Sequence, residues 1–196
     1  MKRRFLLLAI ATLAVLFAAA ALFQLFQPYV RARILLSRIS KLQVGRTSFE
    51  EAQRVGKELG SQGNEPCSPE DCYWTFEVDN FRLPAVWRKD GERFVAGYRI
   101  QNSVLSEQRF MFQIGTGFNA LTAEFWERET WPHFPSQFIV GTQTAPTHPH
   151  FRSYVKLTPA TAADVRERYL KFELNCLWKY HGCADAKELL PTVDWN

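Results

Sequence analysis

Acidic and histidine side chains gather in one part of this sequence, between residues 124 and 150. Glu124, Glu127 and Glu129 lie in the run EFWERETW, and His133 follows closely. Two carboxylates can act as general acid and general base, so a hydrolase with its site in residues 124–150 is one hypothesis. Charged residues that alternate along an edge strand are the simpler interpretation of the same pattern.

A metal site is a second possibility in this region. His148 and His150 flank Pro149, and His133 lies upstream. Proline fixes an extended kink between the two histidines, and no carboxylate is near them in sequence, so solvated loop histidines are favoured. The sequence also lacks a P-loop, GxGxxG, G-x-S-x-G or HExxH motif. We therefore predict no metal, no cofactor and no identifiable catalytic residue.

A proline-rich stretch over residues 131–149 is predicted to be a long loop. It contains Pro132, Pro135, Pro146 and Pro149. So many prolines disfavour continuous regular structure, and long ordered loops often bind partners. The aromatic residues of this stretch suit a binding patch; they are Trp131, Phe134 and Phe138.

Four cysteines fall into two local pairs, Cys67 with Cys72 and Cys176 with Cys183. An even number of cysteines in an exported chain indicates disulfides, either within the local pairs or crossed between them. The spacings are looser than those of a zinc knuckle, and neither pair has the C-x-x-C spacing of a redox dithiol. We predict two structural disulfides, and both connectivities remain open.

The N-terminal segment is apolar enough to enter a membrane. Residues 5–26 contain only Thr12 and Gln24 as polar side chains. A helix of this length extends roughly 33 Å and can cross the hydrocarbon core of a bilayer. The run Ala18-Ala19-Ala20 offers a cleavage pattern, but the chain stays apolar beyond it, which favours a retained anchor. We expect residues 1–27 to be a signal anchor or signal peptide, with membrane lipid as the partner of residues 5–26.

Charge is distributed unevenly along the chain. Eight of the 24 basic residues and none of the 20 acidic ones lie in the first 46 residues, so the remaining chain has 16 basic and 20 acidic residues. A folded part without a basic surplus makes a nucleic-acid partner a poor hypothesis. The basic juxtamembrane segment, residues 28–47, can lie on anionic headgroups or pack on its own domain.

The orientation signals conflict. The positive-inside count alone would place the domain in the cytoplasm. The signal-like leader and the paired cysteines favour the opposite side. We expect a single-pass membrane protein with its domain extracytoplasmic, on the periplasmic side.

Turn and capping signals divide residues 48–196 into the short elements of one domain. Ser48 and Glu51 have capping-box spacing at the start of a helix over 49–58, which Gly60 ends. Alternating apolar residues predict strands over 73–78 and 94–100, with further strands over 105–114, 118–126 and 151–157. Hairpin-like links between these strands indicate an antiparallel sheet.

The strongest helical pattern of the domain lies near the C-terminus. Val165, Tyr169, Phe172 and Cys176 recur at helical spacing, which predicts a long helix that ends at Gly182. The fold class is then α+β. An N-terminal membrane helix precedes one compact domain, in which helices pack on one face of an antiparallel sheet.

One stretch resembles a known family. The run LQVGRTSFEE, residues 42–51, is followed by a helix that ends at Gly60, a polar loop and the aromatic strand YWTF. Over residues 42–80 this order resembles the opening of the SmpA/OmlA (BamE-like) domain. The resemblance implies a small module of helix and antiparallel sheet that acts by binding in the envelope, without catalysis. The chain lacks the lipobox cysteine of that family and adds the long C-terminal helix.

These observations favour a membrane-anchored bacterial envelope protein that serves as a non-catalytic interaction or assembly module. Its partner would be a protein of the envelope. An extracytoplasmic hydrolase with its site around residues 124–150 is the alternative.

Overall fold

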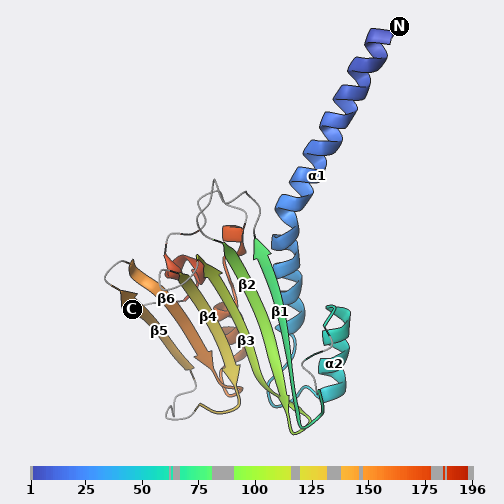
Figure 1. Cartoon of the computed structure of the whole chain (residues 1–196). Coiled ribbons are helices and arrows are strands. Elements are labelled where there is room, and N and C mark those ends of the chain that lie inside the picture. The colour runs from blue at the N-terminus through green and yellow to red at the C-terminus, as the bar shows by residue number, and fades with distance from the viewer. Residues whose placement is uncertain are drawn as a thin grey trace.

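The computed structural model describes residues 2–61, 63, 67–80, 91–115, 120–131, 138–145, 148–177, 183 and 185–193. For residues 2–9, 25, 80, 138, 144, 145 and 148–151 only the backbone is described. The fold is α+β, as predicted, with a six-stranded sheet and helices that pack on one of its faces (Figure 1).

The sheet is mixed, which corrects the prediction of an antiparallel sheet. Its strand order is β1-β2-β3-β4-β6-β5. The strands are β1 (Asp71–Asn80), β2 (Glu92–Gln101), β3 (Val104–Ile114), β4 (Leu121–Arg128), β5 (Phe138–Ala145) and β6 (His148–Leu157). Neighbouring strands are antiparallel except β4 and β6, which are parallel. Strand β4 is therefore an interior strand, so the edge-strand interpretation of its acidic residues was wrong.

Strand β5 lies inside the stretch that we predicted as a loop over residues 131–149. The strand contains the β-branched residues Ile139, Val140 and Thr142 and pairs with β6. None of the four prolines lies in β5, and Pro149 precedes the β4–β6 ladder, which begins at Arg152. Proline is excluded only where a ladder needs its missing N–H, so proline density alone misled the prediction. The β5–β6 hairpin places β6 beside β4 in parallel.

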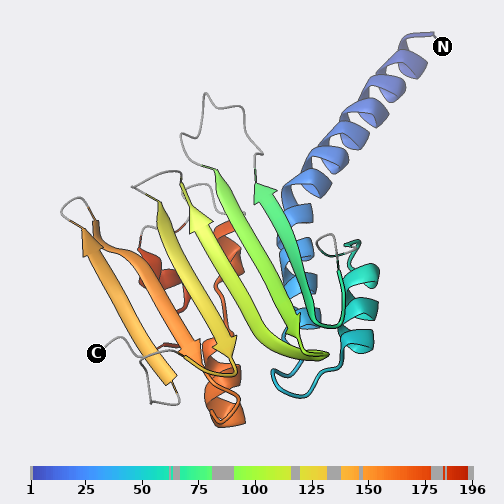
Figure 2. The same cartoon turned by 60° about the horizontal axis from the view of Figure 1, so that its bottom comes forward.

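Helix α1 (Lys2–Ile39) is continuous through Pro28 and has two different halves (Figure 2). Its last turns pack on the sheet, where Ala32, Leu35 and Ile39 are almost fully buried. The described part Ile10–Ile39 is long and apolar enough to cross a membrane, with a mean hydropathy of 2.0 in its apolar window. An N-terminal signal sequence meets the same criterion. Together with the disulfides, this helix suggests an envelope or extracytoplasmic domain.

Helix α2 (Phe49–Glu58) begins where the capping signal predicts. The Ser48 hydroxyl accepts a hydrogen bond of 3.3 Å from the Glu51 backbone N–H, and Gly60 follows the helix at φ +84°. The Tyr98 hydroxyl donates to the carbonyl of Ala52 at 2.8 Å. Helix α2 therefore covers the β1 and β2 side of the same sheet face as α1.

The prediction of a long C-terminal helix is wrong. Helix α3 (Ala163–Tyr169) has only seven residues, and two 3-10 helices follow, η2 (Leu174–Leu177) and η3 (Ala186–Leu189). The Glu173 backbone N–H donates to the Leu189 carbonyl at 2.9 Å, so a tertiary contact takes the place of a helical bond. This path buries both Leu177 and Phe172 in the core, with Phe172 packed on Phe94 and Phe110 of the sheet, which outweighs the helical preference of the segment.

Both disulfides join local pairs. Cys67 bonds Cys72 and Cys176 bonds Cys183, with Cα–Cα distances of 4.6 and 5.4 Å. The predicted disulfides are therefore present, and the connectivity that the sequence left open is the local one. The first closes the loop ahead of β1, and the second closes the segment after η2.

Candidate functional site

The two faces of the sheet have different surroundings. We refer to the face that packs against α1, α2 and the 3-10 helices as the helix-covered face, and to the other as the open face. In the described part of the chain no helix lies on the open face (Figures 1 and 2). Side chains alternate between the two faces along each strand, so the strand register assigns every sheet residue to one of them.

A row of large polar and aromatic side chains crosses the open face. Arg109 of β3 lies opposite Trp126 of β4, which lies beside Lys156 of β6. The Arg109 guanidinium carbon is 5.0 Å from the centroid of the Trp126 ring. This distance is within the range of a cation–π interaction.

Trp131 extends this row just after β4. Its ring meets Trp126 edge-on, with centroids 6.4 Å apart and planes at 76°. Arg128 and Lys156 also lie over the Trp131 ring, at 5.7 and 5.1 Å from its centroid. The indole N–H donates to the Leu157 carbonyl at 2.8 Å, which fixes the ring on the sheet. We refer to Arg109, Trp126, Arg128, Trp131 and Lys156 as the Trp–Arg cluster.

The carboxylates near this cluster lie beneath the cations. Glu124 accepts from Arg152 Nη2 at 2.7 Å and from Trp126 Nε1 at 3.0 Å, and Glu107 pairs with Arg128 Nε at 2.9 Å. The two glutamate side chains are 10% and 11% exposed, whereas both arginine side chains are 39% exposed. The surface that a partner would meet is therefore cationic and aromatic.

Of the predicted binding patch, the structure places Trp131 in this cluster. Phe138 begins β5 and pairs with Leu157, but its side chain is not described. Phe134 lies outside the described residues. The other members of the cluster were missed, because they come from three strands whose pairing a single sequence does not give. The alternation of Trp126 and Arg128 in β4 was the one local signal for them.

The acidic residues that suggested a hydrolase are separated by the fold. Glu124 lies on the open face with Arg152, Glu127 lies on the helix-covered face, and Glu129 is exposed. His133 lies outside the described residues, and the side chains of the histidines at 148 and 150 are not described. Within the described residues, no three His, Cys, Asp or Glu side chains form a possible metal site. Each of the two buried glutamates has an arginine partner.

The helix-covered face contains a second polar group, which joins four segments of the chain. Arg166 of α3 donates through Nε to Glu127 at 2.7 Å and through Nη2 to Gln108 Oε1 at 3.0 Å. Gln108 Nε2 donates to the carbonyl of Ile39, at the end of α1. Burial raises the pKa of Glu127, and the neighbouring guanidinium opposes that change. This group fixes the end of α1 to β3, β4 and α3, and we refer to it as the Glu127–Arg166 network.

No family model, curated protein or solved structure matches this chain. The resemblance of residues 42–80 to the SmpA/OmlA domain therefore stays a prediction.

Proposed function

We propose that this chain is a membrane-anchored envelope protein whose domain binds an acidic surface of a protein partner through the open face of its sheet, without catalysis. One observation carries the proposal. The Trp–Arg cluster lies on a face that no described helix covers, the side chains of its Arg128 and of the neighbouring Arg152 are 39% exposed, and Glu107 and Glu124 lie beneath them. Tryptophan and arginine are the residue types that contribute most to protein interfaces.

The positive charge of the open face indicates that its partner is acidic. Four cations lie together on β3, β4 and β6, whereas the nearby Glu107 and Glu124 are largely covered. The β1 and β2 side of the open face differs, because Arg93 and Arg99 there pair with exposed carboxylates. An acidic surface would therefore be attracted to the β3, β4 and β6 side of the face.

The cluster is also held in place before any partner arrives. The Trp131 indole is fixed by its hydrogen bond to Leu157 and the Trp126 indole by its bond to Glu124. Tyr154 packs across Gly141 of β5, where a Cβ would overlap the tyrosine ring. A prearranged surface loses less side-chain entropy on binding.

Site-specific photocrosslinking in cells tests the proposal. A photoreactive amino acid replaces Met111 or Thr122, which lie on the open face beside the cluster, and in a matched control it replaces the exposed Arg54 of α2. We expect one protein adduct of the same mass from both open-face positions and none from position 54. The double substitution Arg109→Gln with Lys156→Gln should remove the adduct and leave the disulfides formed.

The opposite pattern would overturn the proposal. Adducts of equal yield from position 54 would assign binding to another surface. No adduct from either open-face position would remove the support for a protein partner. An adduct that survives neutralisation of both cations would show that the partner is not recognised by its acidic charge.

A further inference from the structure

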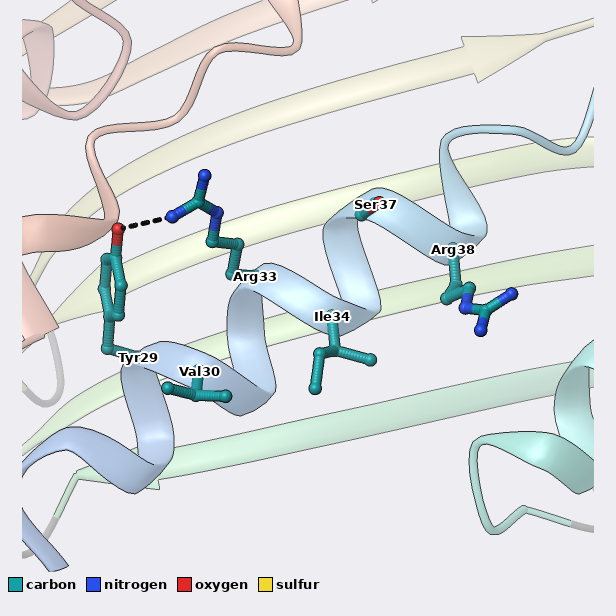
Figure 3. A pocket seen from close by; sticks show the side chains of 6 residues that line it. All are labelled: Tyr29, Val30, Arg33, Ile34, Ser37 and Arg38. Carbon is teal, nitrogen blue, oxygen red and sulfur yellow. Dashed lines mark hydrogen bonds between the residues drawn. The ribbon is translucent and has the colours of Figure 1, made fainter. Parts of the chain in front are cut away.

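The half of α1 that follows the apolar run has an exposed side where apolar residues and arginines lie together. Val30 and Ile34 are 50% and 49% exposed there, while the opposite side of the helix packs on the sheet. Two shallow hollows flank these residues. One, of about 380 Å³, is lined by Tyr29, Val30, Arg33, Ile34, Ser37 and Arg38 (Figure 3). The other, of about 300 Å³, lies on the membrane side and is lined by Phe23, Phe26, Gln27, Val30, Arg31 and Ile34.

The cations of this surface have no acidic partners among the residues that the structure describes. The first 46 residues contain no Asp or Glu. Within the described residues, Arg31, Arg33 and Arg38 form no ion pair, and all three are exposed. Arg33 donates a 3.5 Å hydrogen bond from its Nη1 to the Tyr29 hydroxyl. Its guanidinium therefore keeps donors free for an anion.

The distance from the apolar run places two of these arginines at the bilayer surface. Arg31 and Arg33 follow Phe26 by five and seven residues, or about 8 to 10 Å along a helix. The headgroup layer is about 5 to 7 Å deep. Side chains on a helix lean toward its N-terminus, which is the membrane side here, so both guanidiniums can reach back into that layer. In Figure 3 the Arg33 side chain extends toward Tyr29, whereas Arg38 points away from it.

We infer that the membrane-side part of this surface, formed by Tyr29, Val30, Arg31 and Arg33, binds the headgroup of an anionic phospholipid. The inference rests on the proposed membrane anchor. Arg33 lines the first hollow and Arg31 the second. Each contacts a lipid phosphate from its own side of Val30, and Val30 with Phe26 contacts the start of the acyl chains. This surface continues the apolar side of the membrane-spanning run, and a phosphate supplies the negative charge that the segment lacks.

A second copy of the chain is a poorer occupant of the same surface. A parallel pair of α1 helices would bring the three arginines of one copy close to the same three of the other. No carboxylate in the first 46 residues could neutralise them. Repulsion between like charges therefore opposes this pairing.

Lipid selectivity of the full chain in vesicles tests the inference. The wild type is reconstituted in phosphatidylcholine vesicles that contain spin-labelled phosphatidylglycerol or spin-labelled phosphatidylcholine, and the immobilised fraction of each label is measured. We expect a preference for phosphatidylglycerol of about fivefold or more, since each arginine near an anionic surface contributes about that factor. The Arg31→Gln and Arg33→Gln double variant should lose most of it.

Arg38→Gln is the matched control, because Arg38 is on the same helix but about 18 Å beyond Phe26, outside the headgroup layer. It should keep the wild-type preference. Flotation of the vesicles separates the two proposals. A wild type that does not float would overturn the anchor and the headgroup site together. Floating protein without a preference would overturn the headgroup site alone, and a dimer under those conditions would assign the surface to a second copy.

Discussion

Each face of the sheet has an ion pair between a glutamate of β4 and an arginine, and the two pairs differ in how far they are exposed to solvent. Strand β4 contributes Glu127 to the helix-covered face and Glu124 to the open face, and each accepts a 2.7 Å bond from an arginine. Glu127 and Arg166 are 4% and 21% exposed, whereas Glu124 and Arg152 are 10% and 39% exposed. The Glu127–Arg166 pair joins segments inside the fold, and the Glu124–Arg152 pair, in which only the arginine is partly exposed, lies under the surface of the open face.

The difference lies in what surrounds each arginine. Arg166 donates to Gln108 and to the Leu42 carbonyl as well as to Glu127, so it compensates three groups that water does not reach easily. Arg152 donates to Glu124 at the edge of the solvent. A buried charge without a partner is costly, and a partly solvated one is not. We therefore expect substitutions on the two faces to affect different properties.

Loss of the buried cation should have the largest effect. Arg166→Met leaves Glu127 enclosed without its cation, which should lower the free energy of unfolding by about 3 to 5 kcal/mol. Chemical denaturation with the disulfides intact measures this change. Adding Glu127→Gln removes the uncompensated charge, so the double variant should be more stable than Arg166→Met alone. Equal stability of the two would contradict the account of this network.

Trp131→Ala should have the largest effect on binding. The open-face crosslinking yield should fall at least tenfold, because a tryptophan at the centre of an interface contributes about 2 kcal/mol or more. The free energy of unfolding should fall by less than in Arg166→Met. A variant that unfolds as readily as Arg166→Met would show that Trp131 belongs to the core instead.

The pH dependence of stability should separate Glu127 from the other carboxylates. Burial raises its pKa above 4.5 in the folded chain, so the folded state binds the proton more tightly than the unfolded state. The contribution of Glu127 is therefore greatest at low pH and declines as the pH rises through the raised pKa. Unfolding from about pH 4 to about pH 8 should show the wild type losing stability relative to Glu127→Gln as the pH rises. A wild type that gains stability relative to Glu127→Gln with rising pH would mean that the ion pair lowers the pKa.

Arg152→Gln should have the smallest effect on stability, although it matches Arg166→Met in removing the partner of a β4 glutamate. The Arg152 side chain is 39% exposed, and Glu124 keeps its bond from the Trp126 indole. We expect a loss of about 1 kcal/mol or less. A loss as large as that of Arg166→Met would remove the distinction between the faces.

Local signals in the sequence predicted the elements that depend on neighbours along the chain. The Ser48 cap, the Gly60 stop and the alternating apolar residues of β1 and β2 are all short-range patterns. The apolar N-terminal run likewise predicted the unburied half of α1. In these segments the local preference and the tertiary contacts agree, which is why prediction succeeded.

The predictions failed where contacts between residues distant in sequence determine the secondary structure. The helix that begins with α3 ends at Tyr169 because the following backbone bonds η3. Strand β5 forms because its backbone hydrogen-bonds to β6 in an antiparallel hairpin. The parallel pairing of β4 with β6 follows from that hairpin. The Trp–Arg cluster depends on the same register. A single sequence contains the residues of this surface but not the strand order that brings them together.

The most direct test of the central claim compares tryptophans from both faces in one measurement. Hydroxyl-radical oxidation of the chain is read by mass spectrometry for Trp126 and Trp131 on the open face and for the fully buried Trp74 on the helix-covered face. We predict that the two open-face tryptophans oxidise readily in the purified protein and become protected in native membranes. Trp74 should stay unreactive in both. Equal oxidation of Trp126 and Trp131 in the two preparations would contradict the claim that a partner binds the open face.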